Sequence, residues 1–171
     1  NRNIEDITSN NVEKILKDSI TTLEEFVEGI INKYKNKSQE ELMQEFNLTS
    51  HPKNLNSILI NRMFNVTKLS DTEEFQKAKI IPKTIRIEEN GHIKESISFP
   101  YFKYIDLANQ TWETSELKEE LETTKYMFFV FKKEHSQYIF KGIKLWNMPE
   151  LDIENHVMNM WNNTYNTVIS G

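Results

Sequence analysis

The stretch YMFFVF at Tyr126–Phe131 is apolar throughout, as expected for a strand that is buried on both of its faces. KEHS at Lys133–Ser136 then indicates a turn, after which Gln137–Trp146 returns as a neighbouring strand. Upstream, IIPKTIRI at Ile80–Ile87 is rich in β-branched residues and predicts a further strand. These segments predict a sheet in the middle and second half of the chain.

A hairpin signal follows the first of these strands. ENG at Glu89–Gly91 is typical of a tight turn, so His92–Phe99 is predicted to return as a strand. Apolar residues share one face of this predicted strand, and Glu95 is the polar exception on that face. Tyr101–Trp112 is predicted to form a helix or an irregular segment.

Helices are predicted before the sheet. Apolar residues recur at helical spacing over Val12–Leu23 and Phe26–Ile31. The capping box at Ser38–Glu41 predicts a short helix that reaches Phe46, and Asn54–Phe64 is predicted to form another.

One more helix is predicted at the end of the chain. Pro149 suits its first turn, and an apolar stripe follows at Ile153, Val157, Trp161, Tyr165 and Val168. The order of helices, sheet and helix predicts an α+β or mixed-sheet α/β fold in which helices cover the sheet. A length of 171 residues fits one domain, spanning residues 1–171.

Composition narrows the class of protein. Hydrophobic residues make up 37% and charged residues 27%, as in a globular domain. The absence of cysteine excludes disulfides and thiolate metal sites, and it fits a reducing cytoplasm. No apolar run approaches the length of a membrane span, so we expect a cytoplasmic protein with no membrane partner.

The net charge of −5 argues at first against a nucleic-acid partner. The acidic excess is concentrated in residues 1–50, and two later stretches, Lys77–Arg86 and Lys125–Trp146, are rich in basic residues. Local basic patches can bind phosphate on an acidic protein. Exposed lysines that only solvate strand edges are the alternative, and the residues alone favour it.

General catalytic motifs are missing from the sequence. There is no glycine-rich phosphate loop, and the four histidines have no metal-ligand spacing. Metal-dependent nucleases often hold Mg²⁺ with an acid on one strand and Glu-x-Lys on the next. The literal Glu-x-Lys here, Glu116–Lys118, lies in a stretch typical of a solvated helix start, whereas the strand that should carry the motif reads IIPKT at Ile80–Thr84.

That strand introduces a family resemblance. Lys83-Thr84 after an apolar pair resembles the Glu-x-Lys-Thr strand of the MutH mismatch-repair nucleases and their restriction-enzyme relatives. Segments in the same order are similar to other parts of that family: Trp112–Ser115, Tyr126–Phe131, Leu145–Glu150 and Met160-Trp161. The resemblance implies a restriction-endonuclease-like, MutH-like fold, with a mixed sheet flanked by helices.

A more specific resemblance is to the C-terminal half of the two-domain, GATC-cutting Sau-type restriction enzymes. It runs from about Phe26 to Thr167 and depends on Lys94–Phe99, Leu107–Asn109, Ile139–Lys144, Met148–Glu150 and Met160-Trp161. In that family the half in question binds a second copy of DNA and acts as an effector of the catalytic half. We therefore expect this chain to be a fragment of a longer protein.

Departures from the family pattern decide the expected activity. The helix glutamate of the family falls at about Asn61, its first motif acid at Glu74, and the Glu of Glu-x-Lys at Ile81. The lysine is kept as Lys83, and an accessory lysine falls loosely near Glu122. Because Mg²⁺ needs several oxygen ligands, we expect no metal, no cofactor and no catalytic residue in this domain, although the resemblance implies Mg²⁺ in the parent enzyme.

The resemblance thus implies a noncatalytic, allosteric DNA-binding effector domain of a type II restriction endonuclease. Its expected partners are double-stranded DNA containing GATC and the catalytic half of the same chain. The residues predicted to contact the DNA backbone are Lys53, Lys83, Arg86, Lys141 and Lys144.

Two alternatives stay open. One is an active Mg²⁺-dependent nuclease that uses Glu74, Lys83 and an unassigned acid. The other is a protein-interaction module that has lost DNA binding, which the acidic first 50 residues favour. The family's C-terminal half also continues, beyond the final Trp helix, into a tail associated with DNA recognition, and its loss would weaken binding.

Overall fold

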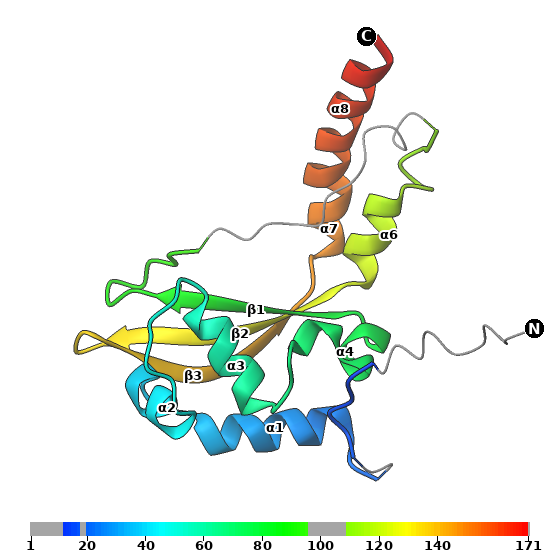
Figure 1. The fold of residues 1–171 in the computed structure, drawn as a ribbon. Coiled ribbons are helices and arrows are strands. Elements are labelled where there is room, and N and C mark those ends of the chain that lie inside the picture. The colour runs from blue at the N-terminus through cyan, green and yellow to red at the C-terminus, as the bar shows by residue number, and fades with distance from the viewer. Residues whose placement is uncertain (1–11, 18–19, 96–108, 171) are drawn as a thin grey trace, which may run out of the picture.

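A mixed three-stranded sheet forms the centre of the molecule in the computed structural model, which describes residues 12–17, 20–95 and 109–170 (Figure 1). β1 (Ile80–Ile87) is parallel to the central strand β2 (Lys125–Glu134), and β3 (Gln137–Trp146) is antiparallel to it. β2 has a neighbour on each side, and its residues from Tyr126 to Phe129 are all buried. The predicted buried strand and its antiparallel partner are confirmed.

The turn between β2 and β3 is the one that the sequence indicates. Glu134 pairs with Gln137, which leaves His135 and Ser136 as the two turn residues. Both have positive φ values, 48° and 67°, as the central residues of a type I′ turn do. The right-handed twist of the two strands favours this turn type.

Helices before the sheet cover one of its faces. Met127, Phe129 and Phe131 of β2 belong to a core cluster that includes residues from α1 and α3. Thr22 and Ser38 begin α1 and α2 with complete capping boxes. The elements are α1 (Leu23–Tyr34), α2 (Gln39–Glu45), α3 (Leu55–Met63), the 3₁₀ turn η1 (Leu69–Asp71) and α4 (Glu73–Lys77).

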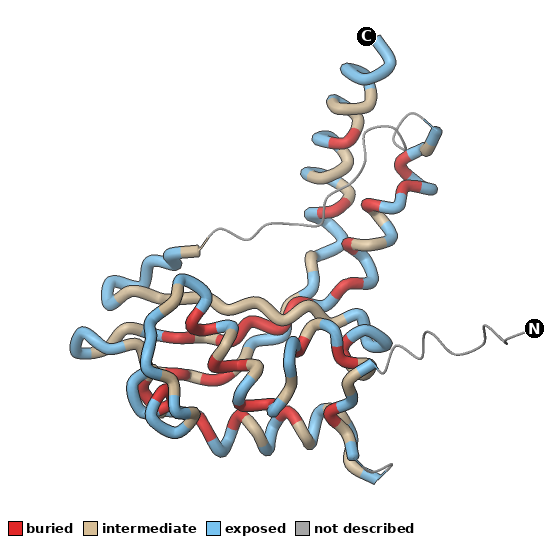
Figure 2. Tube along the Cα trace, in the orientation of Figure 1, coloured by how far each residue is buried: buried red, intermediate tan, exposed pale blue. Residues whose placement is uncertain are grey.

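A second, smaller core lies where the last helices meet. α6 (Glu116–Thr123) lies beside the closing helical segment, and the pair projects from one end of the sheet (Figures 1 and 2). Trp112 and Trp161 pack here with ring centroids 6.1 Å apart. The closing segment consists of α7 (Glu150–Asp152), the π-helical turn η2 (Ile153–Val157) and α8 (Met158–Ser170).

A β-bulge between Val130 and Phe131 lies where β3 is in contact with α1. Gly142, opposite Val130, has a φ of 108°, which residues other than glycine rarely adopt. A Cβ atom there would lie 3.4 Å from Ile31 Cγ2 of α1. The glycine therefore permits the backbone conformation of the bulge, and a Cβ at this distance would be in ordinary van der Waals contact with the helix.

Two sequence predictions are wrong in the described residues. The helix predicted over Val12–Leu23 is not helical at residues 12–17, and α1 begins only at Leu23. Ile15 is nevertheless buried in the core, as part of an irregular segment. The strand predicted at His92–Phe99 is reduced to an isolated bridge between Ile87 and Ile93, and residues 96–99 lie outside the described part.

Residues 101–108, for which a helix or irregular structure was predicted, also lie outside the described residues. Within the described part, no helix has both the length and the apolar character needed to cross a membrane. The mixed sheet with helices around it agrees with the expected restriction-endonuclease-like α+β architecture.

Candidate nucleic-acid interface

Two lysines lie on either side of one aromatic residue across the sheet. Lys83 of β1 and Lys144 of β3 are both register partners of Phe128 on β2. Side chains of register partners lie on the same face of a sheet, and successive residues of a strand point to opposite faces. Since Phe129 faces α1 and α3, Phe128 and the two lysines are on the other face.

Aromatic rings lie on the same face of the sheet as these lysines. The ring of Phe128 lies 6.2 Å from that of Tyr126 and 6.3 Å from that of Trp146, measured between centroids. Lys144 is exposed and Lys83 is half-buried. Neither ammonium belongs to an ion pair among the described residues.

The other predicted DNA contacts lie elsewhere. Lys53 and Arg86 line a cleft of about 530 Å³ on the α3 side of the sheet, with Thr84 and Tyr138. Lys141 lies at the bulge, where its ammonium is 2.9 Å from the carboxylate of Glu134. This contact lowers the pKa of Glu134 and neutralises part of the lysine's charge. The five predicted contacts therefore divide among three places.

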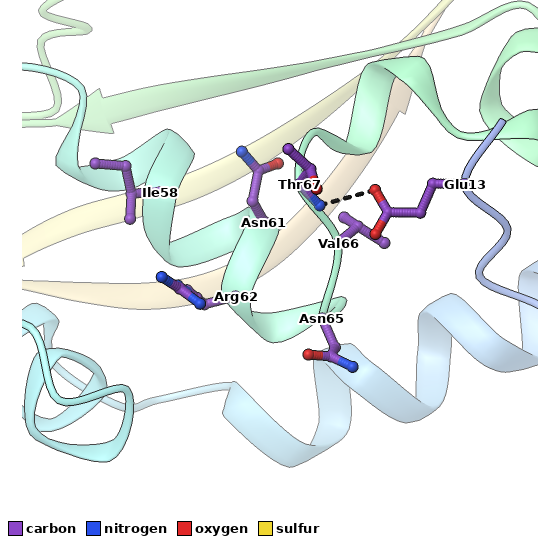
Figure 3. Close-up of a pocket in the computed structure, with 7 residues that line it drawn as sticks. All are labelled: Glu13, Ile58, Asn61, Arg62, Asn65, Val66 and Thr67. Atoms are coloured by element: carbon purple, nitrogen blue, oxygen red, sulfur yellow. Dashed lines mark hydrogen bonds between the residues drawn. The ribbon is translucent and has the colours of Figure 1, made fainter. Parts of the chain in front are cut away.

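The positions where the resemblance places the family's catalytic acids are also divided between the two faces of the sheet. Ile81 lies on the same face as Lys83, two residues before it on β1. Asn61 is on α3, and its Oδ1 accepts a hydrogen bond from the backbone N–H of Leu69 at 3.0 Å. Asn61 contributes to a pocket of about 460 Å³ beside Arg62 and Thr67 (Figure 3).

Glu74 has a structural role in the observed arrangement. Its two carboxylate oxygens accept hydrogen bonds from the backbone N–H groups of Ile15, at 3.2 Å, and Leu16, at 2.9 Å. Glu13, in the same segment, makes a further contact with the body of the domain, because its Oε2 accepts a hydrogen bond from the N–H of Thr67 at 2.8 Å (Figure 3). Glu74 thus holds the segment of residues 12–17 against the body of the domain.

These residues do not fit a Mg²⁺ ion. Ile81 has no ligating atom, and the oxygens of Asn61 and Glu74 already accept backbone hydrogen bonds. In the segments that the structure describes, no group of three or more His, Asp or Glu residues lies close enough together to hold a metal ion.

The literal Glu-x-Lys triplet lies at the start of α6, as its surroundings predict. Ser115 caps this helix by accepting from the N–H of Lys118 at 3.2 Å. Lys118 Nζ lies 2.6 Å from a carboxylate oxygen of Glu154, and the Trp112 indole donates to the same carboxylate at 3.1 Å. The lysine of the triplet therefore joins α6 to the closing helical segment.

Sequence reasoning missed three residues around the cleft. Glu95 lies in it and pairs with Arg86, and Tyr138 lies under the guanidinium of Arg86. Glu88 in turn accepts a hydrogen bond from the Tyr138 hydroxyl. Burial and then the Glu88 carboxylate raise the pKa of Tyr138 to about 12. The signal for Glu95 was present, since it is the polar residue on an otherwise apolar face of the predicted strand.

Comparison with known proteins gives the chain a relative. It is 34% identical over 178 aligned residues to the type II restriction enzyme Sau3AI of Staphylococcus aureus, and the alignment covers 94% of this chain. No protein-family model matches the sequence. The chain spans only 36% of the length of Sau3AI. It is therefore homologous to part of a type II restriction enzyme.

Proposed function

We propose that the chain is a noncatalytic DNA-binding effector domain of a type II restriction endonuclease, and that it corresponds to the C-terminal half of its relative. Similarity to a restriction enzyme over nearly the whole chain supports a role in DNA restriction. The observation that carries the noncatalytic assignment is Ile81, an apolar residue where the resemblance expects a metal-binding glutamate. Glu74 offers no replacement, because it holds the segment at residues 12–17.

Binding to the DNA backbone would use the sheet lysines. Lys83 and Lys144 lie on one face and form no ion pair with the described residues, and phosphate contacts by such lysines set affinity and its salt dependence. Lys53 and Arg86 would make further contacts from the cleft, and Lys141 from the bulge. GATC as the recognised sequence depends on the family resemblance, since no side chain here announces base readout.

The effector role concerns the rest of the parent protein. DNA bound to this domain would favour the active arrangement of a catalytic half, which would carry the Mg²⁺. The partners proposed are thus double-stranded DNA and that catalytic half. Adding a GATC duplex too short to be cleaved should then increase the cleavage rate of the whole enzyme, and an unchanged rate would contradict the effector role.

A second candidate function is a protein-interaction module that no longer binds DNA. It is favoured by large apolar side chains exposed on the closing helical segment, where Leu151 is 74%, Met160 50% and Ile169 57% exposed. Salt-insensitive binding to the catalytic half without any binding to duplex DNA would support it. The other alternative, an active nuclease, lacks a ligating atom at Ile81 and is tested by a nicking assay.

A further inference from the structure

The cleft on the α3 side of the sheet has the features of an anion site. It is lined by the turn that leads into α3, by β1 and β3, and by Glu95. Lys53 and Arg86 bring positive charge to it, and Glu95 is the one carboxylate among the described residues that line it. A volume of about 530 Å³ leaves ample room for a phosphate group.

The direction of the Arg86 side chain in this cleft is fixed by its neighbours. Its position on β1 places its side chain on the same face as Phe131, its register partner on β2. The guanidinium carbon lies 5.9 Å from the centroid of the Tyr138 ring, a cation–π contact that fixes its direction. Tyr138 is itself fixed, because its hydroxyl donates to Glu88 Oε1 at 2.5 Å.

Glu95 binds Arg86 as an oxyanion ligand would. One of its carboxylate oxygens accepts from the backbone N–H of Arg86 at 2.6 Å, and the other accepts from the guanidinium Nε. Two oxygens of a phosphate can accept from a backbone N–H and a guanidinium in the same way. The carboxylate therefore occupies the position and satisfies the donors that a phosphate would.

Glu95 is held by few contacts and is partly exposed to solvent. It lies in an irregular segment after the isolated Ile87–Ile93 bridge, and the backbone bond next to it joins the Lys94 N–H to the Arg86 carbonyl at 3.0 Å. Its side chain is 25% exposed, so solvent and ligands reach it. The nearby Lys94 and Lys133 form their ion pairs with Glu88 and not with Glu95.

We infer that Arg86 and Lys53 form a phosphate-binding site whose place is taken by the Glu95 carboxylate in the free protein, and that a DNA phosphate displaces it on binding. This inference rests on the proposed DNA-binding function and adds a regulatory step to it. Glu95 acts as an internal competitor, which lowers nonspecific affinity for weakly bound anions. Only a ligand that gains enough contacts elsewhere, as duplex DNA does, opens the site.

The test uses the chain with Glu95→Gln, which keeps the shape of the side chain and removes its charge. The matched control is Glu28→Gln, the same change at an exposed position on α1. By fluorescence anisotropy at low salt, Glu95→Gln should bind a labelled duplex about three- to tenfold more tightly than the control variant. With Arg86→Gln also present, the gain in affinity should fall below about twofold, because the Arg86 guanidinium that Glu95 occupies is then absent.

An equal gain from both glutamate variants, or an undiminished gain with Arg86→Gln, would overturn the inference. A second measurement separates it from the proposed function: titration with inorganic phosphate, followed by the NMR signals of the Arg86 backbone and side-chain N–H groups. These signals should shift at lower phosphate concentration in Glu95→Gln than in the unaltered chain. Phosphate shifts without duplex binding by any variant would keep the site and refute the DNA-binding function. Duplex binding without phosphate shifts in Glu95→Gln would keep the DNA-binding function and refute the phosphate site.

Discussion

Lys83 and Lys144 flank Phe128 on one face of the sheet, although they are far apart in the sequence and lie on the two outer strands. The parallel β1–β2 pairing and the antiparallel β2–β3 pairing together produce this row. The lysine that the family resemblance assigns to a catalytic motif is thus accompanied by a second cation and by aromatic rings, and carboxylates do not flank it across the strands. Such a row suits contact with a phosphate backbone better than it suits metal-dependent hydrolysis.

Replacing either sheet lysine should weaken DNA binding. Lys83→Gln and Lys144→Gln should each reduce duplex affinity about two- to fivefold. Each should also make the negative slope of log K against log salt shallower by about one, because each removes one phosphate contact. The measurement is anisotropy at several salt concentrations. Lys35→Gln, at the exposed C-cap of α1, is the control. Equal effects at all three positions would show that only net charge matters.

The domain itself should not cut DNA. Supercoiled plasmid incubated with the chain and Mg²⁺ or Mn²⁺ should remain supercoiled, because Ile81 cannot ligate a metal and Glu74 is engaged by the backbone of Ile15 and Leu16. Metal-dependent nicking that Glu74→Ala abolishes would refute the noncatalytic assignment and would support the active-nuclease alternative.

Glu74 should contribute to stability. Glu74→Ala removes the acceptor for two backbone N–H groups in the segment at residues 12–17, and we expect it to lower the free energy of unfolding by about 1–2 kcal/mol. Urea denaturation measures this change. Gln76→Ala, at an exposed position on the same helix α4, should cost less than about 0.5 kcal/mol. Similar losses for the two variants would mean that the segment does not depend on Glu74.

Acid should weaken the second core through Glu154. The Lys118 ammonium, and after it the Trp112 indole, hold the pKa of Glu154 below its ordinary value of 4.5. A lowered folded-state pKa gives stability that is present above the ordinary value and is lost as the pH falls through the folded-state pKa. The Tm of the unaltered chain should therefore exceed that of Glu154→Gln at pH 7.

The difference in Tm between these two proteins should shrink as the pH falls below about 4.5, because protonation of Glu154 then removes the same charge that the substitution removes. Thermal unfolding followed by circular dichroism at several pH values measures it. A Tm difference that stays constant from pH 7 to about pH 3 would show that the ion pair with Lys118 is not what the substitution affects.

Local patterns in the sequence predicted the sheet well. The run at Tyr126–Phe131 is apolar throughout, and in the structure every residue of it except the half-buried Val130 is buried. The turn at His135 and Ser136 and the capping box at Ser38 are signals carried by adjacent residues, and all three predictions are confirmed.

Long-range contacts explain the failures. Residues 12–17 have helical spacing of apolar residues, but Glu74, 58 residues beyond Leu16, provides the acceptors for their backbone N–H groups. Glu95 illustrates the same limit at the candidate site. The pattern marked it as an unusual polar residue, yet its pairing with Arg86 depends on how the chain returns after β1. The row of Lys83 and Lys144 likewise required the register of three strands.

The most direct test of DNA recognition compares two labelled duplexes, one with GATC and one with the same bases scrambled, by fluorescence anisotropy at low and moderate salt. The measurement is repeated with and without Ca²⁺, which replaces Mg²⁺ without supporting cleavage. We predict tighter binding to the GATC duplex, no requirement for the metal ion, and weaker binding at the higher salt concentration. No binding to either duplex, by a chain whose thermal unfolding is cooperative, would contradict the proposal that this domain recognises DNA.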